Sequence, residues 1–262
     1  MNGAAGGDAS DAPPPPADTA ADQPDVAAEE ATVEENSTDR LLTLSDGVFA
    51  VAITLLVLDI KVPHPSAVSD GVTTPTGHAA TTLLAVFAAF LPVWPALAGY
   101  VLSFVTIGIM WTNHCVLFRY IKRNDSLLTA ANSLLLLIVA FVPFVTAVLS
   151  EYLVLPAPYP QAATLIYAGT NCLMAVAFNL LWNHAARDYQ LLDRSLDPRL
   201  FDHVTKRYRY GPLIYAICFV LGFVNVPLTL SVIALLAIYF ALPYGEEERA
   251  IAERVRRWKV SH

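Results

Sequence analysis

Long apolar stretches recur along the chain and limit its possible folds more than any other feature of the sequence. A helix rises about 1.5 Å per residue, so crossing a hydrocarbon core of about 30 Å takes roughly 20 apolar residues. Candidate spans cover about residues 41–60, 93–118, 127–150, 161–184, 210–225 and 227–243. With 55% hydrophobic and only 15% charged residues, the chain is also too apolar for an ordinary soluble protein. The sequence therefore predicts an all-α integral membrane protein with six transmembrane helices.

The last two candidate spans are the shortest and lie almost end to end. Gly222, Asn225 and Pro227 fall between them, and residues of these types favour a turn. A single helix over residues 210–243 would be far longer than one crossing requires. We therefore expect a tight helical hairpin at this point.

Three further segments complete the predicted organisation around a six-helix membrane domain at 39–244. Residues 1–38 are rich in acidic residues, alanine and proline, with no aromatic residue and no signal-peptide pattern, so we expect a disordered cytosolic tail. The apolar run 79–91 is too short to span, and we expect it to lie at the outer surface or at a pore mouth. Residues 245–262 are expected to form a cytosolic C-terminal helix.

Basic residues mark one side of the membrane. Outside the spans they occur before the first, after the second, between the fourth and fifth, and after the sixth: Arg40, Arg119, Lys122, Arg123, Arg187, Arg194, Arg199, Lys206, Arg207, Arg209, Arg249, Arg254, Arg256, Arg257 and Lys259. The three alternate connections contain only Lys61. Because cytoplasmic loops carry an excess of lysine and arginine, we expect a multi-pass protein of the cell membrane with both termini in the cytoplasm.

Charge and motif content exclude several classes of function. Residues 1–39 hold ten acidic and no basic residues, so the rest of the chain carries thirteen acids against sixteen bases. Residues 40–262 are therefore mildly basic, which favours contact with anionic lipid headgroups. Their basic residues are scattered along the chain, so they do not indicate nucleic-acid binding. The three cysteines lie far apart in apolar runs, and no metal site, disulfide or cofactor is expected. No hydrolase, nucleotide-binding or metalloprotease motif occurs, so we do not expect an enzyme.

The first span carries an ionisable residue close to its cytosolic end. Ser45 or Asp46 could serve as the N-cap of the helix, which is a common role for these residues. A helix from Gly47 to Ile60 would be only about 21 Å long, however, which is short of the hydrocarbon thickness. We therefore expect the helix to begin near Arg40. An ionisable residue such as Asp46 inside it needs a partner and is a functional candidate.

The second span supplies candidate partners for that carboxylate. Trp111, Asn113 and His114 lie near its cytosolic end, at the depth expected for Asp46. A tryptophan there is often only an interface anchor, and a single histidine is often structural. Their side chains offer hydrogen-bond donors to Asp46. We favour a structural hydrogen-bond cluster over a direct role in permeation or gating.

These residues also carry a resemblance to a known family. The segment Arg40-x-x-x-Leu44-Ser45-Asp46-Gly47, followed by Ala-Ile-Thr-Leu-Leu-Val-Leu-Asp, resembles the first-helix signature of the transmembrane protein 175 family. These are lysosomal potassium channels and their prokaryotic relatives. Residues 103–114 are similar to the family's second helix, and Asn132 with 143–146 is similar to its third. The likeness covers about 40–150, and the last three spans match by hydropathy alone.

The resemblance implies a tetrameric cation channel of unconventional type, with the first helix lining the pore. A chain with one six-helix unit is expected to assemble as a homotetramer. Carried over by offset from Asp46, the pore positions are Val51, Leu55 and Leu58, with Thr54 beside them. Their spacing places the three apolar residues on one helix face. They could instead face lipid or other helices, because nearly every residue of this span is apolar.

The resemblance also implies how ions would be selected. The chain contains no Thr-Val-Gly-Tyr-Gly filter sequence. A ring of aliphatic side chains cannot coordinate an ion, but it can close by dewetting or force partial dehydration, which favours potassium over sodium modestly. Thr54 could supply hydroxyl oxygens in place of water. Asp59 could concentrate cations at the outer mouth, or it could be an ordinary interfacial carboxylate.

Three residues depart from the family pattern. Leu44 replaces a phenylalanine near the cytosolic cluster, and Val51 replaces a larger aliphatic residue at the narrowest level expected. Four smaller side chains should widen that ring and weaken selectivity. Cys115 stands where many relatives have a second histidine, so any proton sensitivity of a histidine pair should be weaker.

The leading hypothesis is therefore a leak-type, weakly potassium-selective channel for monovalent cations. A secondary transporter is a second possibility, and it would need broken helices at the membrane midplane and often inverted repeats. Pro143 could break the third span, but no paired break or convincing repeat is visible. A proton-permeable channel is a third possibility, because transient water wires through a weak filter would pass protons.

Overall fold

The computed structural model describes residues 23–62, 90–187, 191–192, 205–206 and 208–241. These residues form an all-helical structure, as predicted. Its helices are α1 (Gln23–Leu55), α4 (Trp94–Tyr120), α5 (Ser126–Tyr152), α6 (Tyr159–Ala186), α8 (Gly211–Leu221) and α9 (Val226–Ala241), with short 3₁₀ turns η1 (Leu56–Asp59) and η2 (Leu91–Val93). Four of the described segments are long and apolar enough to cross a membrane. They are Ser37–Asp59 in α1 and η1, Leu91–Tyr120 in η2 and α4, and the helices α5 and α6.

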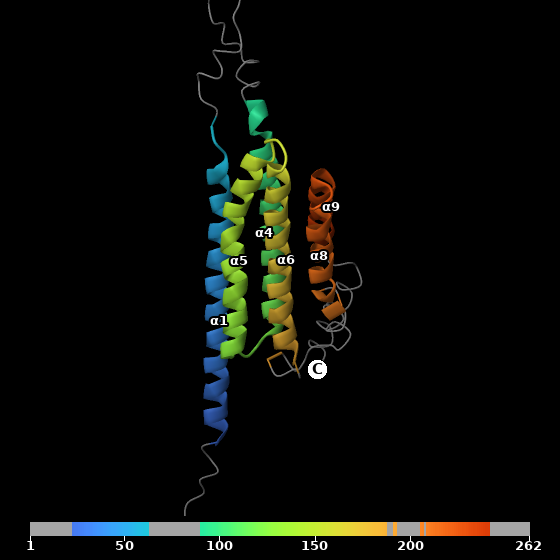
Figure 1. The fold of residues 1–262 in the computed structure, drawn as a ribbon. Coiled ribbons are helices and arrows are strands. Elements are labelled where there is room, and N and C mark those ends of the chain that lie inside the picture. Colours follow the sequence, from blue (N-terminus) through green and yellow to red (C-terminus); the bar gives the residue numbers. More distant parts are fainter. Residues whose placement is uncertain (1–22, 63–89, 188–190, 193–204, 207, 242–262) are drawn as a thin grey trace, which may run out of the picture.

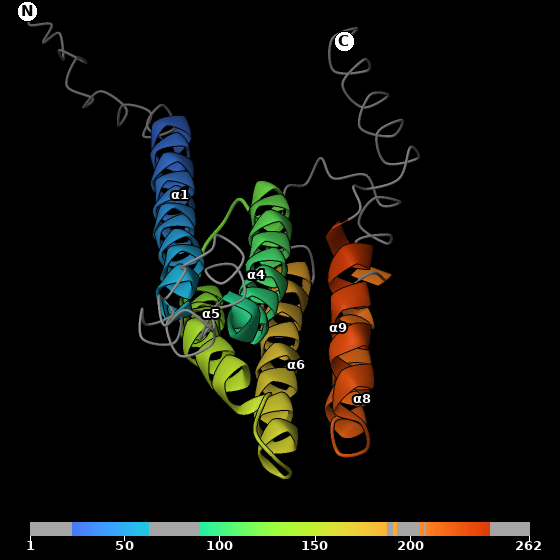
Figure 2. The same ribbon diagram turned by 90° about the horizontal axis from the view of Figure 1, so that it is seen from above.

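The helices lie side by side, with α1 at one edge and the α8–α9 pair at the other (Figures 1 and 2). Between these edges, α5 contacts α1, α4 and α6, and α6 contacts α8. Helix α9 packs against α4, α6 and α8. One face of α1 therefore meets the bundle, while the rest of the helix surface lies at the edge of the described structure.

The predicted hairpin near the C-terminal end is confirmed. Helix α8 ends at Leu221, and α9 begins at Val226 after a turn. The side-chain oxygen of Asn225 accepts a hydrogen bond of 2.9 Å from the backbone N–H of Leu228, and Pro227 occupies the first turn of α9. With 11 and 16 residues, both helices are shorter than the four described segments that are long enough to cross a membrane.

The structure corrects the predicted start of the first helix. Helix α1 begins at Gln23, well before the expected boundary at residue 39. The expectation of a disordered tail is therefore wrong for residues 23–38. Alanine and glutamate favour helix, and extending an existing helix adds one hydrogen bond per ordered residue without a new nucleation step. The segments 1–22, 79–89 and 245–262, for which other expectations were made, lie outside the described residues.

Candidate functional site

Helix α1 has two distinct faces, and only one of them packs against the rest of the subunit. Its buried side chains recur every three or four residues: Leu41, Ser45, Phe49, Ala52 and Leu56. The predicted pore residues lie on another side, and Val51, Leu55 and Leu58 are 56%, 43% and 76% exposed. At 100° per residue, Val51 and Leu55 lie about 40° apart around the axis of α1. Leu58 follows three residues later in the 3₁₀ turn η1, where three residues make one turn, so it lies on the same side as Leu55. The subunit thus presents a continuous apolar stripe along α1.

Thr54 is exposed beside this stripe, with its hydroxyl turned toward the backbone. It donates to the carbonyl oxygens of Ala50 and Val51, at 3.0 and 2.9 Å. A threonine hydroxyl keeps acceptor lone pairs when its proton is used in this way. The arrangement leaves the Thr54 oxygen able to accept from a water or to face a cation.

The expected partnership between Asp46 and Trp111 is present. The indole Nε1–H of Trp111 donates a hydrogen bond of 2.8 Å to Oδ1 of Asp46. The thiol of Cys115, one helical turn further along α4, lies 3.7 Å from the same oxygen. The Asp46 carboxylate is therefore held by α4 on the side of α1 that faces the bundle.

A second contact between α1 and the bundle runs through a residue that was not predicted as part of the site. The side-chain amide of Asn132 on α5 donates to Ser45 Oγ at 2.9 Å, and its oxygen lies 2.8 Å from His114 Nε2. All three residues are buried, and the His114 ring stacks on Phe118 with centroids 4.4 Å apart. Ser45, Asn132 and His114 thus join α1, α5 and α4 by side chains alone.

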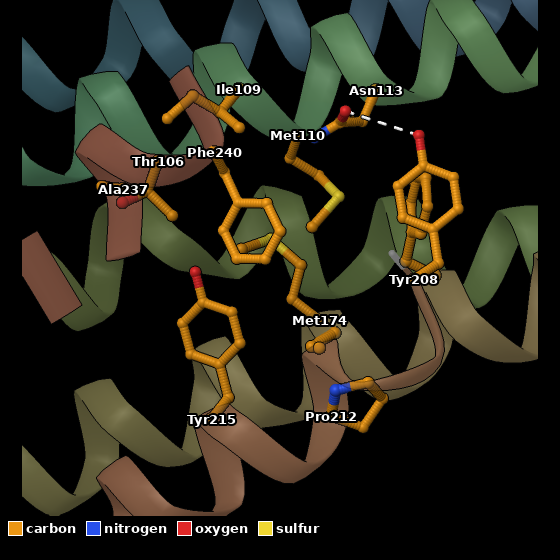
Figure 3. Close-up of a pocket in the computed structure, with 13 residues that line it drawn as sticks. Thr106, Ile109, Met110, Asn113, Met174, Tyr208, Pro212, Tyr215, Ala237 and Phe240 are labelled. Carbon is orange, nitrogen blue, oxygen red and sulfur yellow. Dashed lines mark hydrogen bonds between the residues drawn. The ribbon is translucent and has the colours of Figure 1, made fainter. Parts of the chain in front are cut away.

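The hydrogen bonds found for His114 and Asn113 go to partners other than Asp46. His114 is turned toward α5, as described above. Asn113 accepts a hydrogen bond of 3.4 Å from the hydroxyl of Tyr208, which lies just before α8 (Figure 3). Successive residues on a helix point about 100° apart, so Trp111, Asn113 and His114 face different neighbours.

Arg40 is exposed, and within the described part of the chain it is not joined to this network. At the other end of α1, Asp59 is partly buried and Lys61 forms an ion pair with Glu151 at the end of α5. The neighbouring Glu151 carboxylate raises the pKa of the Lys61 ammonium through a hydrogen bond and direct attraction. This pair joins the segment just after η1 to the C-terminal end of α5.

Two participants were missed by sequence reasoning. Asn132 was noted only for its resemblance to the third helix, although a buried asparagine within an apolar span is itself a signal that it has partners. Tyr208 gave no such signal, because its position depends on how the segment before α8 folds back on α4. Within the described ranges, His, Cys, Asp and Glu form no group of three that could hold a metal ion.

Comparison with known proteins identifies relatives of this chain. The family model of the endosomal/lysosomal potassium channel TMEM175 matches residues 40–143. A potassium channel of Chamaesiphon minutus is 42% identical over 80% of this chain and 96% of its own length. A potassium channel of Streptomyces collinus is 42% identical over 78% of this chain and 92% of its own. The human endosomal/lysosomal proton channel TMEM175 is 33% identical over 42% of this chain and 20% of its own.

Solved structures agree with these matches. The crystal structure of a lysosomal potassium-selective channel TMEM175 homolog from Chamaesiphon minutus has a TM-score of 0.67 and 40% identity. The alignment covers 79% of this chain and 98% of that one. The family and its structural neighbours are ion channels rather than enzymes. This chain is a membrane protein that belongs to the TMEM175 channel family.

Proposed function

We propose that this protein is a leak-type cation channel of the cell membrane, weakly selective for K⁺ over Na⁺. Four copies surround an axis, and α1 of each copy lines the pore. Both termini lie in the cytoplasm, because the basic connections lie on that side. The permeant ions are monovalent cations, with no cofactor or metal required.

The observation that carries this proposal is the exposed apolar stripe of α1. In a single subunit, Val51, Leu55 and Leu58 are exposed although the chain has other apolar helices to cover them. Lipid could cover the stripe equally well. We favour a stripe that faces the pore axis rather than lipid. Relatives that are named potassium channels align with this chain over nearly their full length, which supports a pore in this protein as well.

The network behind α1 supports a fixed rotation of that helix. Ser45 and Asp46 are held by Asn132 and Trp111, on the side of the bundle. Two hydrogen-bonded contacts to different helices resist rotation of α1 about its axis. The exposed stripe is therefore presented in one direction, which a symmetric ring of four helices requires.

A ring of four Val51 side chains would form the constriction. It has no oxygen ligands for an ion, so it acts by dewetting when narrow and by stripping part of the hydration shell when wider. Potassium holds its water less tightly than sodium and passes more easily. Thr54 oxygens, one turn further out, substitute for part of the lost water. Asp59 raises the local cation concentration at the outer mouth.

Flux of K⁺ from liposomes tests the pore assignment. Val51→Trp should abolish the flux, because four indole rings fill the constriction. The matched control is Val57→Trp, since Val57 is also exposed on this span but lies outside the stripe. If the Val51→Trp protein folds correctly and its K⁺ flux is unchanged, α1 does not line the pore as proposed.

A transporter is less well supported by the geometry. The one proline considered as a break, Pro143, lies within a continuous α5 of 27 residues. A current that varies linearly with driving force is expected for the channel, whereas a transporter would show saturable turnover of its solute.

A further inference from the structure

A cavity of about 60 Å³ lies between α4, α6, α8 and α9, and it shares no lining residue with the exposed stripe of α1 (Figure 3). Met110, Met174 and Phe240 form part of its apolar wall, and every residue found to line it is uncharged. Ligand sites in proteins are typically concave and largely apolar, with a few polar groups that orient the ligand. The cavity therefore has the general form of a site for a small neutral molecule.

Polar side chains line the cavity at two levels. At one level the hydroxyl of Tyr208 donates to the side-chain oxygen of Asn113 at 3.4 Å. Thr106 precedes Asn113 by seven residues on α4, which places it about 10 Å away along the helix axis. Thr106 and Tyr215 line the cavity at this second level, and Met110 lies between the two levels on α4 (Figure 3).

Tyr215 has a buried hydroxyl that its own subunit does not satisfy. The residue is only 9% exposed, and its hydroxyl points into the cavity (Figure 3). Among the described residues, no hydrogen bond to this hydroxyl is found. Buried polar groups without a partner are costly and uncommon in folded proteins. The Tyr215 O–H is therefore a donor that an occupant of the cavity can use.

Thr106 offers the complementary group. Its hydroxyl donates to the backbone carbonyl of Leu102 at 2.8 Å, so its oxygen has only lone pairs to offer the cavity. A ligand that satisfies both residues must accept from Tyr215 and donate to Thr106, and the hydroxyl of an alcohol does both through one oxygen. A ketone or an ether can only accept. A carboxylate or an ammonium group would be buried beside no opposite charge in the described lining.

The volume of the cavity limits the size of the occupant. It exceeds the roughly 10–15 Å³ that one water molecule needs, but it is smaller than the apolar cavity of about 150 Å³ that holds benzene. Water could bind to Tyr215, but it gains no partner from the Met110 and Met174 side chains. A chain of two or three carbons covers these side chains while its hydroxyl reaches Tyr215.

We propose that this cavity is a binding site for a short-chain alcohol. The alcohol oxygen accepts from Tyr215 and donates to Thr106, and the carbon chain lies between Met110 and Met174. The bound molecule contacts α4, which also holds Asp46 of α1 through Trp111. The site is separate from the axial pore and does not depend on the position proposed for that pore.

Fluorine NMR of 2-fluoroethanol with the full-length protein in lipid nanodiscs tests the site. The ligand signal should broaden saturably with the protein, and ethanol should reverse the broadening by competition. Acetate and ethylammonium are of similar size but charged, and benzyl alcohol is too large for the cavity, so none of the three should compete. This series decides the proposal without any variant. Competition by acetate equal to that by ethanol, or the same broadening with protein-free nanodiscs, would overturn it.

Tyr215→Phe removes one hydroxyl and keeps the ring. The half-saturating concentration of 2-fluoroethanol should rise about tenfold, as expected for the loss of one buried hydrogen bond. Tyr210→Phe is the matched control, because Tyr210 lies just before α8 but is 55% exposed and outside the cavity. Equal affinities of the Tyr215→Phe and unchanged proteins would contradict the proposal.

Crystals soaked in 2-bromoethanol locate the bound molecule, because bromine gives an anomalous diffraction signal. A bromine peak should lie between Met110 and Met174. A peak in the cavity without saturable binding in solution would mean binding at crystal concentration only, and no peak there would mean that the cavity holds water alone. Either result would overturn the proposal. Val51→Trp should stop K⁺ flux and leave 2-fluoroethanol binding unchanged, so the failure of the pore assignment and that of this site are distinguishable.

Discussion

The indole Nε1–H of Trp111 donates a 2.8 Å hydrogen bond to the carboxylate of Asp46, across 65 positions of sequence. This bond joins α4 to α1. Together with the Ser45–Asn132 bond it fixes which face of α1 meets the bundle. The stability of the subunit and the direction of its apolar stripe therefore depend on the same few side chains.

Replacing Trp111 by phenylalanine should weaken the subunit modestly. A six-membered aromatic ring is kept, but the five-membered ring and its hydrogen bond to the carboxylate are lost, and hydrogen bonds to charged groups contribute about 1.5–3 kcal/mol at most when they are buried. The midpoint temperature of unfolding in detergent should fall by a few degrees. Trp94→Phe is the matched control, because Trp94 is also exposed on α4 and no bond to a carboxylate is found for it among the described residues. Equal shifts in both variants would contradict a specific role for the bond.

Replacing Asn132 should have a larger effect. Asn132→Leu leaves His114 buried without its Asn132 partner, and one such group costs about 1–3 kcal/mol. Ser45 also loses the bond from Asn132 but keeps its bond to the Leu41 carbonyl. We expect a loss of folded protein, or an unfolding midpoint well below that of Trp111→Phe. Ser133→Ala serves as the control, since the adjacent Ser133 is exposed and bonds only to the carbonyl of Thr129. An Asn132→Leu protein as stable as the unchanged protein would show that the three-helix contact contributes nothing.

The connection between α4 and α5 is expected to make the stability of the protein depend on acid pH. Asp125 caps α5, accepting from the backbone N–H of Leu128 at 2.6 Å, and pairs with His184 at 2.9 Å. Partial burial opposes ionisation, but the Leu128 N–H and the His184 ring outweigh it and hold the pKa of Asp125 below its ordinary value. The ionised form is thus stabilised in the folded state. Its contribution is present above the ordinary aspartate pKa of about 3.9 and is lost as pH falls through the lower folded value.

Asp125→Asn tests this dependence, because asparagine keeps the helix cap and removes the charge. The unfolding midpoint of the unchanged protein should fall more steeply below about pH 4 than that of the variant. Because the carboxylate is partly exposed, we expect a small difference that shrinks further in high salt. Parallel curves for the two proteins would show that Asp125 has no stabilising interaction as an anion.

The four described segments long enough to cross a membrane could be predicted from sequence, because their hydropathy and length are properties of single segments. The pairing of Asp46 with Trp111 could also be predicted, since both lie at one depth in neighbouring spans. The true partners of Asn113 and His114 could not, because they depend on the rotation of α4 and on a tyrosine 95 positions away. The early start of α1 was missed for a different reason. Composition indicates whether a segment can bury a core, but not whether an adjoining helix will extend into it.

Val51 sits at the level where we propose the constriction, and its small side chain sets the expected permeability. Val51→Ile adds one methylene to each of four side chains and should narrow the ring, because Val51 is exposed and free to project from α1. A narrower apolar ring strips more water from each ion. Conductance should therefore fall, while the permeability ratio of K⁺ to Na⁺ rises, as measured from reversal potentials in bilayers. Val51→Ala should change both quantities in the opposite direction. Ala50→Val is the control, since Ala50 is exposed on the adjacent position of α1. If the ratio moves equally in the Ala50 and Val51 variants, or not at all in either, the selective ring does not lie at this residue.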